Sequence, residues 1–150
     1  MFDLFREFVQ LTQALDSAGV AYAVCGGVAL AVHGLPRATK DIDLLIPAEQ
    51  LDATRAAART LGFTLESGRM TFSASGVEIQ RLTKVASGDH LMIDLMLVNE
   101  ATRSAWESRH SVAFEDGRVS VVSREGLVGL KKKAGRPQDL ADIARLEAGE

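Results

Sequence analysis

"CGGVALAVHGLPRATKDIDLLI", residues 25–46, joins a double-glycine turn to two aspartates inside an apolar segment. The pattern of "DIDLLI" predicts a buried strand over 41–46. Taking two carboxylates out of water is costly for a folded protein unless positive charge meets them. We therefore expect Asp41 and Asp43 to face a cation, and the rest of the sequence must identify it.

Asp41 and Asp43 lie on one face of the expected strand, because side chains alternate along a strand. Their Cα atoms are then about 6.5–7 Å apart, so both carboxylates can converge on one divalent cation. A structural explanation is also open. Single aspartates in strands commonly face solvent at an edge or a strand end, and Asp41 could cap the start of the strand.

Asp94 is a third carboxylate in an apolar setting, alone within "LMIDLML". If a strand over 90–98 lies beside 41–46, three carboxylates meet on one surface. Acidic oxygens with open coordination suit Mg²⁺, which binds few carboxylates together with substrate phosphates. Asp41, Asp43 and Asp94 are therefore the candidate catalytic and metal-binding residues.

Gly26 and Gly27 follow a short expected strand over 20–25 and precede a short helix over 28–34. Backbone N–H groups at such a turn can cradle an anion, although a Gly-Gly pair by itself is more often just a turn. Arg37 lies in the next loop, near the place where a phosphate would sit. A solvated loop arginine is an equally good interpretation of Arg37.

The rest of the chain predicts one mixed α/β domain over 1–150. Helices are expected over 2–18, 48–61 and 101–109, strands over 62–67, 70–75 and 77–83, and a hairpin over 112–122 around Asp116-Gly117. Two helices over 124–134 and 137–147 end the chain as a C-terminal helical segment. Arg136 and Asp139 either pair with each other or line the site, and the structural role is favoured.

Composition excludes several classes of function. The net charge of -3 gives no overall basic footprint for nucleic acid, although a local patch remains open. The single cysteine, Cys25, excludes an internal disulfide and suggests a reducing compartment. No signal peptide and no apolar run of membrane-spanning length is present, so we expect a cytoplasmic protein without a membrane partner.

The 25–46 segment resembles the signature of the polymerase-beta-like nucleotidyltransferase superfamily, in which a Gly-Gly or Gly-Ser turn and a helix precede a strand with D-x-D. "HG-x-x-R-x-T-x-DID" (33–43) and "KKKAGRPQDLADIARLE" (131–147) look like small stand-alone bacterial members, including toxins of toxin–antitoxin and abortive-infection systems. The resemblance leaves 68–89 and 99–122 unmatched. It implies the nucleotidyltransferase fold, a mixed sheet with helices mainly on one face.

The resemblance also implies a reaction. A nucleoside monophosphate would pass from a nucleoside triphosphate to a hydroxyl of a tRNA, a protein or a small molecule, with two Mg²⁺ ions held by the three aspartates. Gly26, Gly27, Arg37 and Thr39 would bind the nucleotide. Lys131, on the inward stripe of the helix over 124–134, matches the family's C-terminal lysine. An antitoxin or another protein is a possible partner.

Gly27 departs from the family, because many catalytic members have a serine there whose hydroxyl helps to hold a phosphate. Two other functions compete with transfer. A non-catalytic relative could sense nucleotides or join a complex, but it would have no reason to keep buried carboxylates. A metal-dependent hydrolase could use the same acids, but the Gly-Gly turn suits capture of a triphosphate better.

Overall fold

The structure is a computed structural model that describes residues 1–149, built around a sheet of eight strands. The strands are β1 (Ala23–Cys25), β2 (Asp41–Pro47), β3 (Leu65–Glu66), β4 (Met70–Phe72), β5 (Val77–Ala86), β6 (Asp89–Val98), β7 (His110–Phe114) and β8 (Gly117–Val121). Their order is β3-β5-β6-β2-β1-β8-β7, and β4 pairs with β5. β2 is parallel to β6 and β1 to β8, while the other pairs are antiparallel. The predicted mixed sheet is confirmed.

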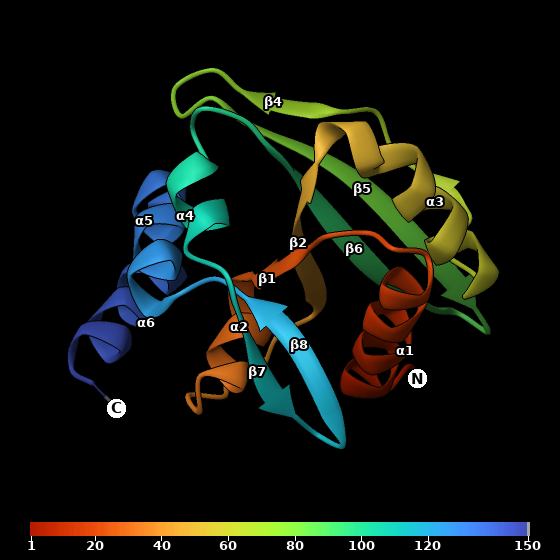
Figure 1. Cartoon of the computed structure of the whole chain (residues 1–150), viewed down its shortest axis with the longest axis horizontal. Coiled ribbons are helices and arrows are strands. Elements are labelled where there is room, and N and C mark those ends of the chain that lie inside the picture. Colours follow the sequence, from red (N-terminus) through yellow and green to blue (C-terminus); the bar gives the residue numbers. More distant parts are fainter. Residues whose placement is uncertain (150) are drawn as a thin grey trace.

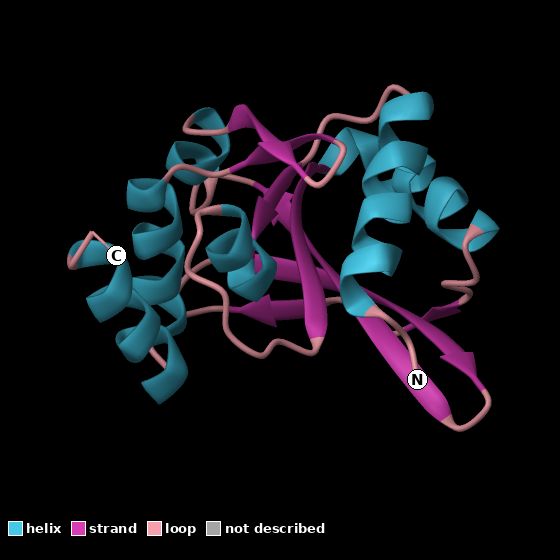
Figure 2. Ribbon diagram, turned by 90° about the horizontal axis from the view of Figure 1, so that it is seen from below, coloured by secondary structure: helices cyan, strands magenta, loops and turns pink. Residues whose placement is uncertain are grey.

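The helices form two groups around this sheet (Figure 1). They are α1 (Leu4–Ser17), α2 (Gly26–Val32), α3 (Leu51–Thr60) after the short 3₁₀ turn η1 (Ala48–Gln50), α4 (Arg103–Glu107), α5 (Arg124–Ala134) and α6 (Pro137–Glu147). α1 and α3 pack together near the N-terminus, and α5 packs against α4 and α6 near the C-terminus. Figure 2 shows the strands between these two groups.

The two faces of β2 and β6 differ in chemistry, as their sequence alternation predicts. Ile42 and Leu44 of β2, with Ile93 and Leu95 of β6, are fully buried in the main apolar core. α1 contributes Phe8, Leu11 and Leu15 to the same core. The opposite face carries the aspartates. The apolar face therefore holds the strands in the core, and the acidic face points away from the core.

The two C-terminal helices begin and end where their sequence predicts. Ser123 caps α5 by accepting a hydrogen bond from the Gly126 N–H, and Pro137 occupies the first turn of α6. Gly135 ends α5 in the left-handed conformation, with φ of 64°. This tight connection folds α6 back against α5.

Several expected elements differ in extent. The strands expected over 20–25, 62–67 and 70–75 are shorter, because β1, β3 and β4 hold only two or three residues each. The hairpin over 112–122 is confirmed, but Phe114 pairs with Gly117, so Glu115-Asp116 form its turn. A second two-residue turn, Ser87-Gly88, has positive φ at both residues and joins β5 to β6.

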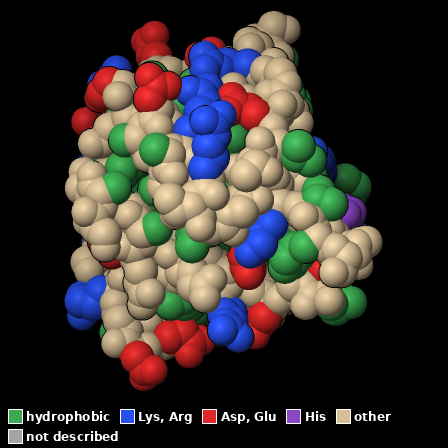
Figure 3. Space-filling model, turned by 90° about the vertical axis from the view of Figure 1, so that its right-hand side faces the viewer, with side chains coloured by type: hydrophobic (Ala, Val, Ile, Leu, Met, Phe, Trp, Pro, Cys, Tyr) green, Lys and Arg blue, Asp and Glu red, His purple; other side chains and the backbone are tan. Residues whose placement is uncertain are grey.

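The surface around α1 and α3 carries acidic and basic side chains intermixed (Figure 3). Within residues 1–149, no helix is long and apolar enough to cross a membrane.

Candidate active site

A row of four side chains runs across the middle of the sheet, one from each of four neighbouring strands. Cys25 of β1 pairs with Asp43 of β2, Asp43 with Asp94 of β6, and Asp94 with Arg81 of β5. Register partners share a face of the sheet, so these four side chains lie on the same side. The expectation that the strand of Asp94 lies beside 41–46 is confirmed. We call Cys25, Asp43, Asp94 and Arg81 the central row.

Burial and neighbouring negative charges disfavour the ionised forms of the carboxylates around this row. Burial, and then the negative charges of Asp94 and Asp41, raises the pKa of Asp43 to about 7. Burial and Asp94 also raise the pKa of Asp41, and burial with Asp43 beside it raises that of the Cys25 thiol. Oδ1 of Asp41 is buried and has no hydrogen-bond partner among residues 1–149. A buried polar atom without a partner in the protein is uncommon, and a bound cation or an ordered water can satisfy it.

Arg81 neutralises part of this charge, and its role is not evident from the sequence motifs. Its Nε donates to Asp94 Oδ1 at 2.7 Å and its Nη2 to Asp94 Oδ2 at 2.9 Å. A signal for this pair was present in the sequence. Ser87-Gly88 is a plausible two-residue turn, and counting outward from it places Arg81 opposite Asp94.

The central row forms the floor of a pocket of about 670 Å³. Its walls come from the α2 turn, the loop before β2, the α5–α6 corner and the β4–β5 hairpin, and all the predicted site residues line it: Gly26, Gly27, Arg37, Thr39, Asp41, Asp43, Asp94 and Lys131. The structure therefore brings these residues into one cavity, although they come from separate segments of the chain.

The two glycines let other parts of the site approach the backbone closely. Gly26 has φ of 65°, and a Cβ added there would overlap the carboxylate of Asp43. A Cβ on Gly27 would lie 2.5 Å from Thr39 Oγ1 and 2.8 Å from Thr39 Cβ. The side chain of Thr39 thus fills the space that a serine at 27 would need. Cys25, the N-cap of α2, makes no side-chain hydrogen bond to the first turn of this helix.

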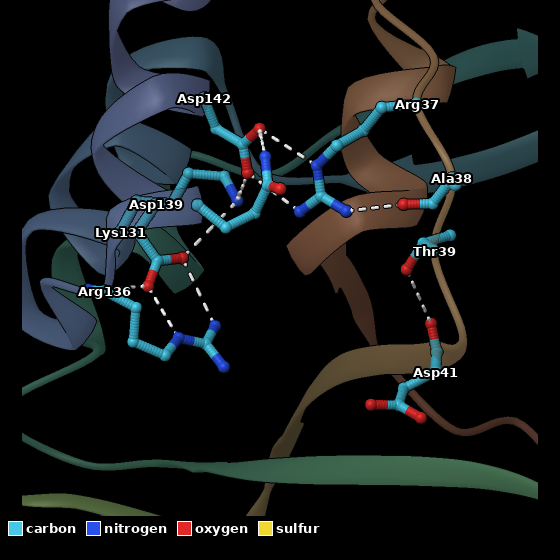
Figure 4. A network of polar contacts seen from close by, with 9 residues as sticks. Arg37, Ala38, Thr39, Asp41, Lys131, Arg136, Asp139 and Asp142 are labelled. Carbon is cyan, nitrogen blue, oxygen red and sulfur yellow. Dashed lines mark hydrogen bonds and ion pairs between the residues drawn. The ribbon is translucent and has the colours of Figure 1, made fainter.

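Asp142 organises the cationic wall of the pocket, and sequence reasoning missed it (Figure 4). It is fully buried and accepts hydrogen bonds from Arg37 Nε and Nη2 at 2.9 and 2.8 Å, and from Lys131 Nζ at 2.8 Å. Burial alone would raise the pKa of Asp142, but these bonds hold it well below its usual range. A buried lysine needs an anionic partner, which is the signal that could have identified Asp142.

Arg136 and Asp139 pair as expected, with Arg136 Nε 2.7 Å from Asp139 Oδ2. Lys131 is 5% exposed and also lies 3.9 Å from Asp139 Oδ1. Arg37 is anchored by Asp142 instead of being a freely solvated loop side chain. The bonds to Asp142 therefore fix the positions of the Lys131 and Arg37 side chains at the pocket.

The side chains around the central row offer a divalent cation carboxylate oxygens but no complete set of ligands. Within residues 1–149, no three Asp, Glu, His or Cys side chains stand in metal-binding geometry, and both oxygens of Asp94 are bound by Arg81. The chemistry of the set nevertheless fits a hard cation, because it offers carboxylate oxygens and one of them, Asp41 Oδ1, has no partner. Asp41, Asp43 and Asp94 therefore fit Mg²⁺ in their chemistry, provided that Arg81 gives up its contact with Asp94.

A protein-family model matches almost the whole chain. The model of the family described as "Nucleotidyl transferase AbiEii toxin, Type IV TA system" matches residues 11–149. No protein with a curated description matches the chain.

Solved structures show the same fold. TM1012 from Thermotoga maritima, assigned as a nucleotidyltransferase, has 14% identity and a TM-score of 0.63 over 98% of this chain and 94% of its own. ANT(2'')-Ia in complex with adenylyl-2''-tobramycin has 17% identity and a TM-score of 0.61, over 93% of this chain and 84% of its own. Its solution structure, described as that of an antibiotic-resistance factor, has 17% identity and a TM-score of 0.62, over 94% and 80%.

Proposed function

Since the chain belongs to the AbiEii family of nucleotidyltransferase toxins, we propose that it moves a nucleoside monophosphate from a nucleoside triphosphate to an acceptor hydroxyl. The whole chain would act as one catalytic domain. The observation that carries this proposal is the register of Asp43 with Asp94 on adjacent parallel strands, beside the unpartnered Oδ1 of Asp41. Carboxylates are kept together at this cost when they have a ligand to hold.

The triphosphate would lie at the α2 end of the pocket. The first-turn N–H groups at Gly26 and Gly27 offer donors to phosphate oxygens, since no side chain of the N-cap residue occupies them. Arg37, whose Nη1 would lie 3.3 Å from a Cβ on Gly27, and Lys131 of α5 supply positive charge, and Asp142 fixes both. The hydroxyl of Thr39 lies beside Gly27 and donates to the Asp41 backbone oxygen at 3.5 Å, a long bond that it could exchange for one to a phosphate.

Asp41, Asp43 and Asp94 would hold Mg²⁺. When bound, the ions would neutralise phosphate charge and acidify the acceptor hydroxyl. In the reaction, the acceptor oxygen bonds to the α-phosphorus while the bond to the bridging oxygen of pyrophosphate breaks. The hydroxyl proton passes to Asp94, and pyrophosphate leaves toward Gly27, Arg37 and Lys131.

The acceptor would occupy the other end of the pocket, because in-line attack comes from the side opposite the leaving group. This end lies at β4, β5 and β6, and Phe72, Ile79 and Met96 give it an apolar lining. A tRNA end, a protein hydroxyl and a small molecule all remain acceptor classes. A toxin role, with an antitoxin as the partner, is part of the proposal because it follows from the family.

The test is transfer of radiolabel. Purified protein is incubated with each NTP labelled at the α-phosphate, Mg²⁺, and total cellular RNA or protein. We expect label in one acceptor fraction, lost in Asp43→Asn and in EDTA, and unchanged in Asp52→Asn. Asp52 is a matched control, because its carboxylate is 97% exposed and lies outside the pocket lining. Absence of transfer with every nucleotide and fraction would contradict the proposal.

A further inference from the structure

Arg81 places a positive charge at Asp94, where a metal cation would otherwise be needed. Its guanidinium binds both oxygens of Asp94, the aspartate at the centre of the central row. The pair joins register partners on β5 and β6, so the strand geometry itself brings the two side chains together. This contact makes no use of a substrate, yet it occupies a carboxylate that the proposed reaction requires.

A divalent cation and Arg81 compete for Asp94. Each oxygen of Asp94 already accepts a charge-assisted hydrogen bond, so a cation could approach only by displacing the guanidinium or by standing next to its positive charge. Like charges at such a separation repel strongly in a partly buried site. The nucleotide-free protein is therefore poorly prepared to bind a metal ion at Asp94.

The guanidinium of Arg81 could also bind a phosphate in the same pocket. Its side chain is 31% exposed, whereas that of Asp94 is 10% exposed, so Arg81 is less enclosed by neighbouring atoms than Asp94. Arg81 also lines the same pocket as Gly27, Arg37 and Lys131. A phosphate offers the planar fork of arginine the same two-point contact that a carboxylate offers.

We propose that Arg81 takes the place of the metal at Asp94 in the nucleotide-free protein. When the nucleotide binds, Arg81 moves to one of its phosphates, and Asp94 turns to the divalent cation. This inference rests on the proposed function and adds a residue to it. It makes Arg81 a substrate-binding residue, and it makes metal and nucleotide binding depend on each other. Such coupling is reciprocal: each ligand strengthens the binding of the other by the same factor.

The experiment measures two affinities in the intact chain. Mn²⁺ alone is titrated against protein, and loss of the free Mn²⁺ electron-spin-resonance signal gives its affinity. Separately, non-cleavable α,β-methylene analogues of the four NTPs are titrated with Mn²⁺ saturating. Arg81→Met keeps the apolar stem and removes the guanidinium, while Arg81→Lys keeps the charge and loses the two-point contact. Lys84→Met is the control, because Lys84 lies on the same strand but pairs with Glu7, away from the pocket.

We expect Arg81→Met to bind Mn²⁺ alone more tightly than the wild type, by roughly tenfold, as is typical of coupled sites. The same variant should bind the preferred analogue more weakly, by a similar factor. Arg81→Lys should shift both affinities in the same directions by less, and Lys84→Met should shift neither. Opposite changes in the two affinities would not arise from a merely structural role, which would weaken both.

Unchanged or weaker Mn²⁺ binding by Arg81→Met and Arg81→Lys would overturn the inference. If the wild type still transferred label in that case, the proposed function would stand without it. If neither the wild type nor the variants bound Mn²⁺ under any condition, both would fall. Unfolding midpoints in EDTA for each variant show that the compared proteins are folded.

Discussion

Lys131 is held in place by Asp142, whose Oδ2 lies 2.8 Å from the lysine Nζ in a setting where both side chains are almost fully buried. The same carboxylate binds Arg37 from the loop before β2. One residue of α6 therefore ties α5 to the segment that leads into β2. We infer that Asp142 positions both cations and does not itself act in the reaction.

Asp142→Asn should destabilise the protein by about 3–5 kcal/mol, because it takes the shared carboxylate from the buried Lys131 ammonium and the partly exposed Arg37 guanidinium. Urea midpoints at neutral pH measure this loss. Asp52→Asn also removes an arginine ion pair, but an exposed one, and its midpoint should stay close to that of the wild type. A fully stable Asp142→Asn would show that Arg37 and Lys131 are held by other contacts.

Asp43→Asn should abolish transfer and leave the metal-free protein as stable as the wild type or more so. The pKa of Asp43 is raised to about 7 in the folded protein. Between about pH 4 and pH 7 the folded protein therefore keeps a proton that the unfolded chain releases. The stability that depends on this carboxyl group is complete below about pH 4 and is lost as the pH rises through about 7. The gain from Asp43→Asn should be on the order of 1–3 kcal/mol at pH 8 and vanish near pH 4.

Denaturant midpoints in EDTA across this pH range test the expectation. A mutant that is clearly less stable than the wild type at pH 8 would mean that Asp43 serves the fold, as a capping or paired aspartate does.

Nucleoside triphosphate should raise the melting temperature only when Mg²⁺ is present. Mg²⁺ would neutralise both the carboxylates and the phosphates, whereas a triphosphate alone adds negative charge beside Asp41 and Asp43. By mass action, the gain is about 2.7 kcal/mol at a hundredfold excess over Kd. Thermal scans with NTP, with and without Mg²⁺, measure it, and equal stabilisation in both would count against a metal at this site.

Gly27→Ala should destabilise the protein by about 1–3 kcal/mol, since its Cβ would meet the side chain of Thr39. Thr39→Gly removes the atoms in question and should cancel most of this loss when the two changes are combined. A double-mutant cycle of unfolding free energies measures the coupling between 27 and 39. Additive effects would show that the loop simply moves aside, and then a serine at 27 would be tolerated.

The parts of the site that are local in sequence were predictable. Alternation placed Asp41 and Asp43 on one face, and the apolar run around Asp94 identified the strand beside them. The helices expected over 124–134 and 137–147 match the bounds of α5 and α6.

The missing parts lie outside the recognised motifs. Arg81 lies in 68–89, a segment outside the family resemblance, and its place opposite Asp94 follows from the register of the β5–β6 hairpin, counted from the Ser87-Gly88 turn. Asp142 becomes important only when α6 folds back onto Lys131 and Arg37. The short strands β3 and β4 show the same limit, because strand length at a sheet edge is decided by pairing and not by propensity.

The position of the Arg81–Asp94 pair in the chain bears on the order in which the protein folds. The two residues are 13 apart and belong to one hairpin closed by a two-residue turn, whereas β2 joins β6 across a much longer stretch of chain. Local hairpins form faster than pairings that close long loops. We expect Asp94 to be neutralised before β2 arrives, so the chain never has to bring three uncompensated acids together on its way to the native state.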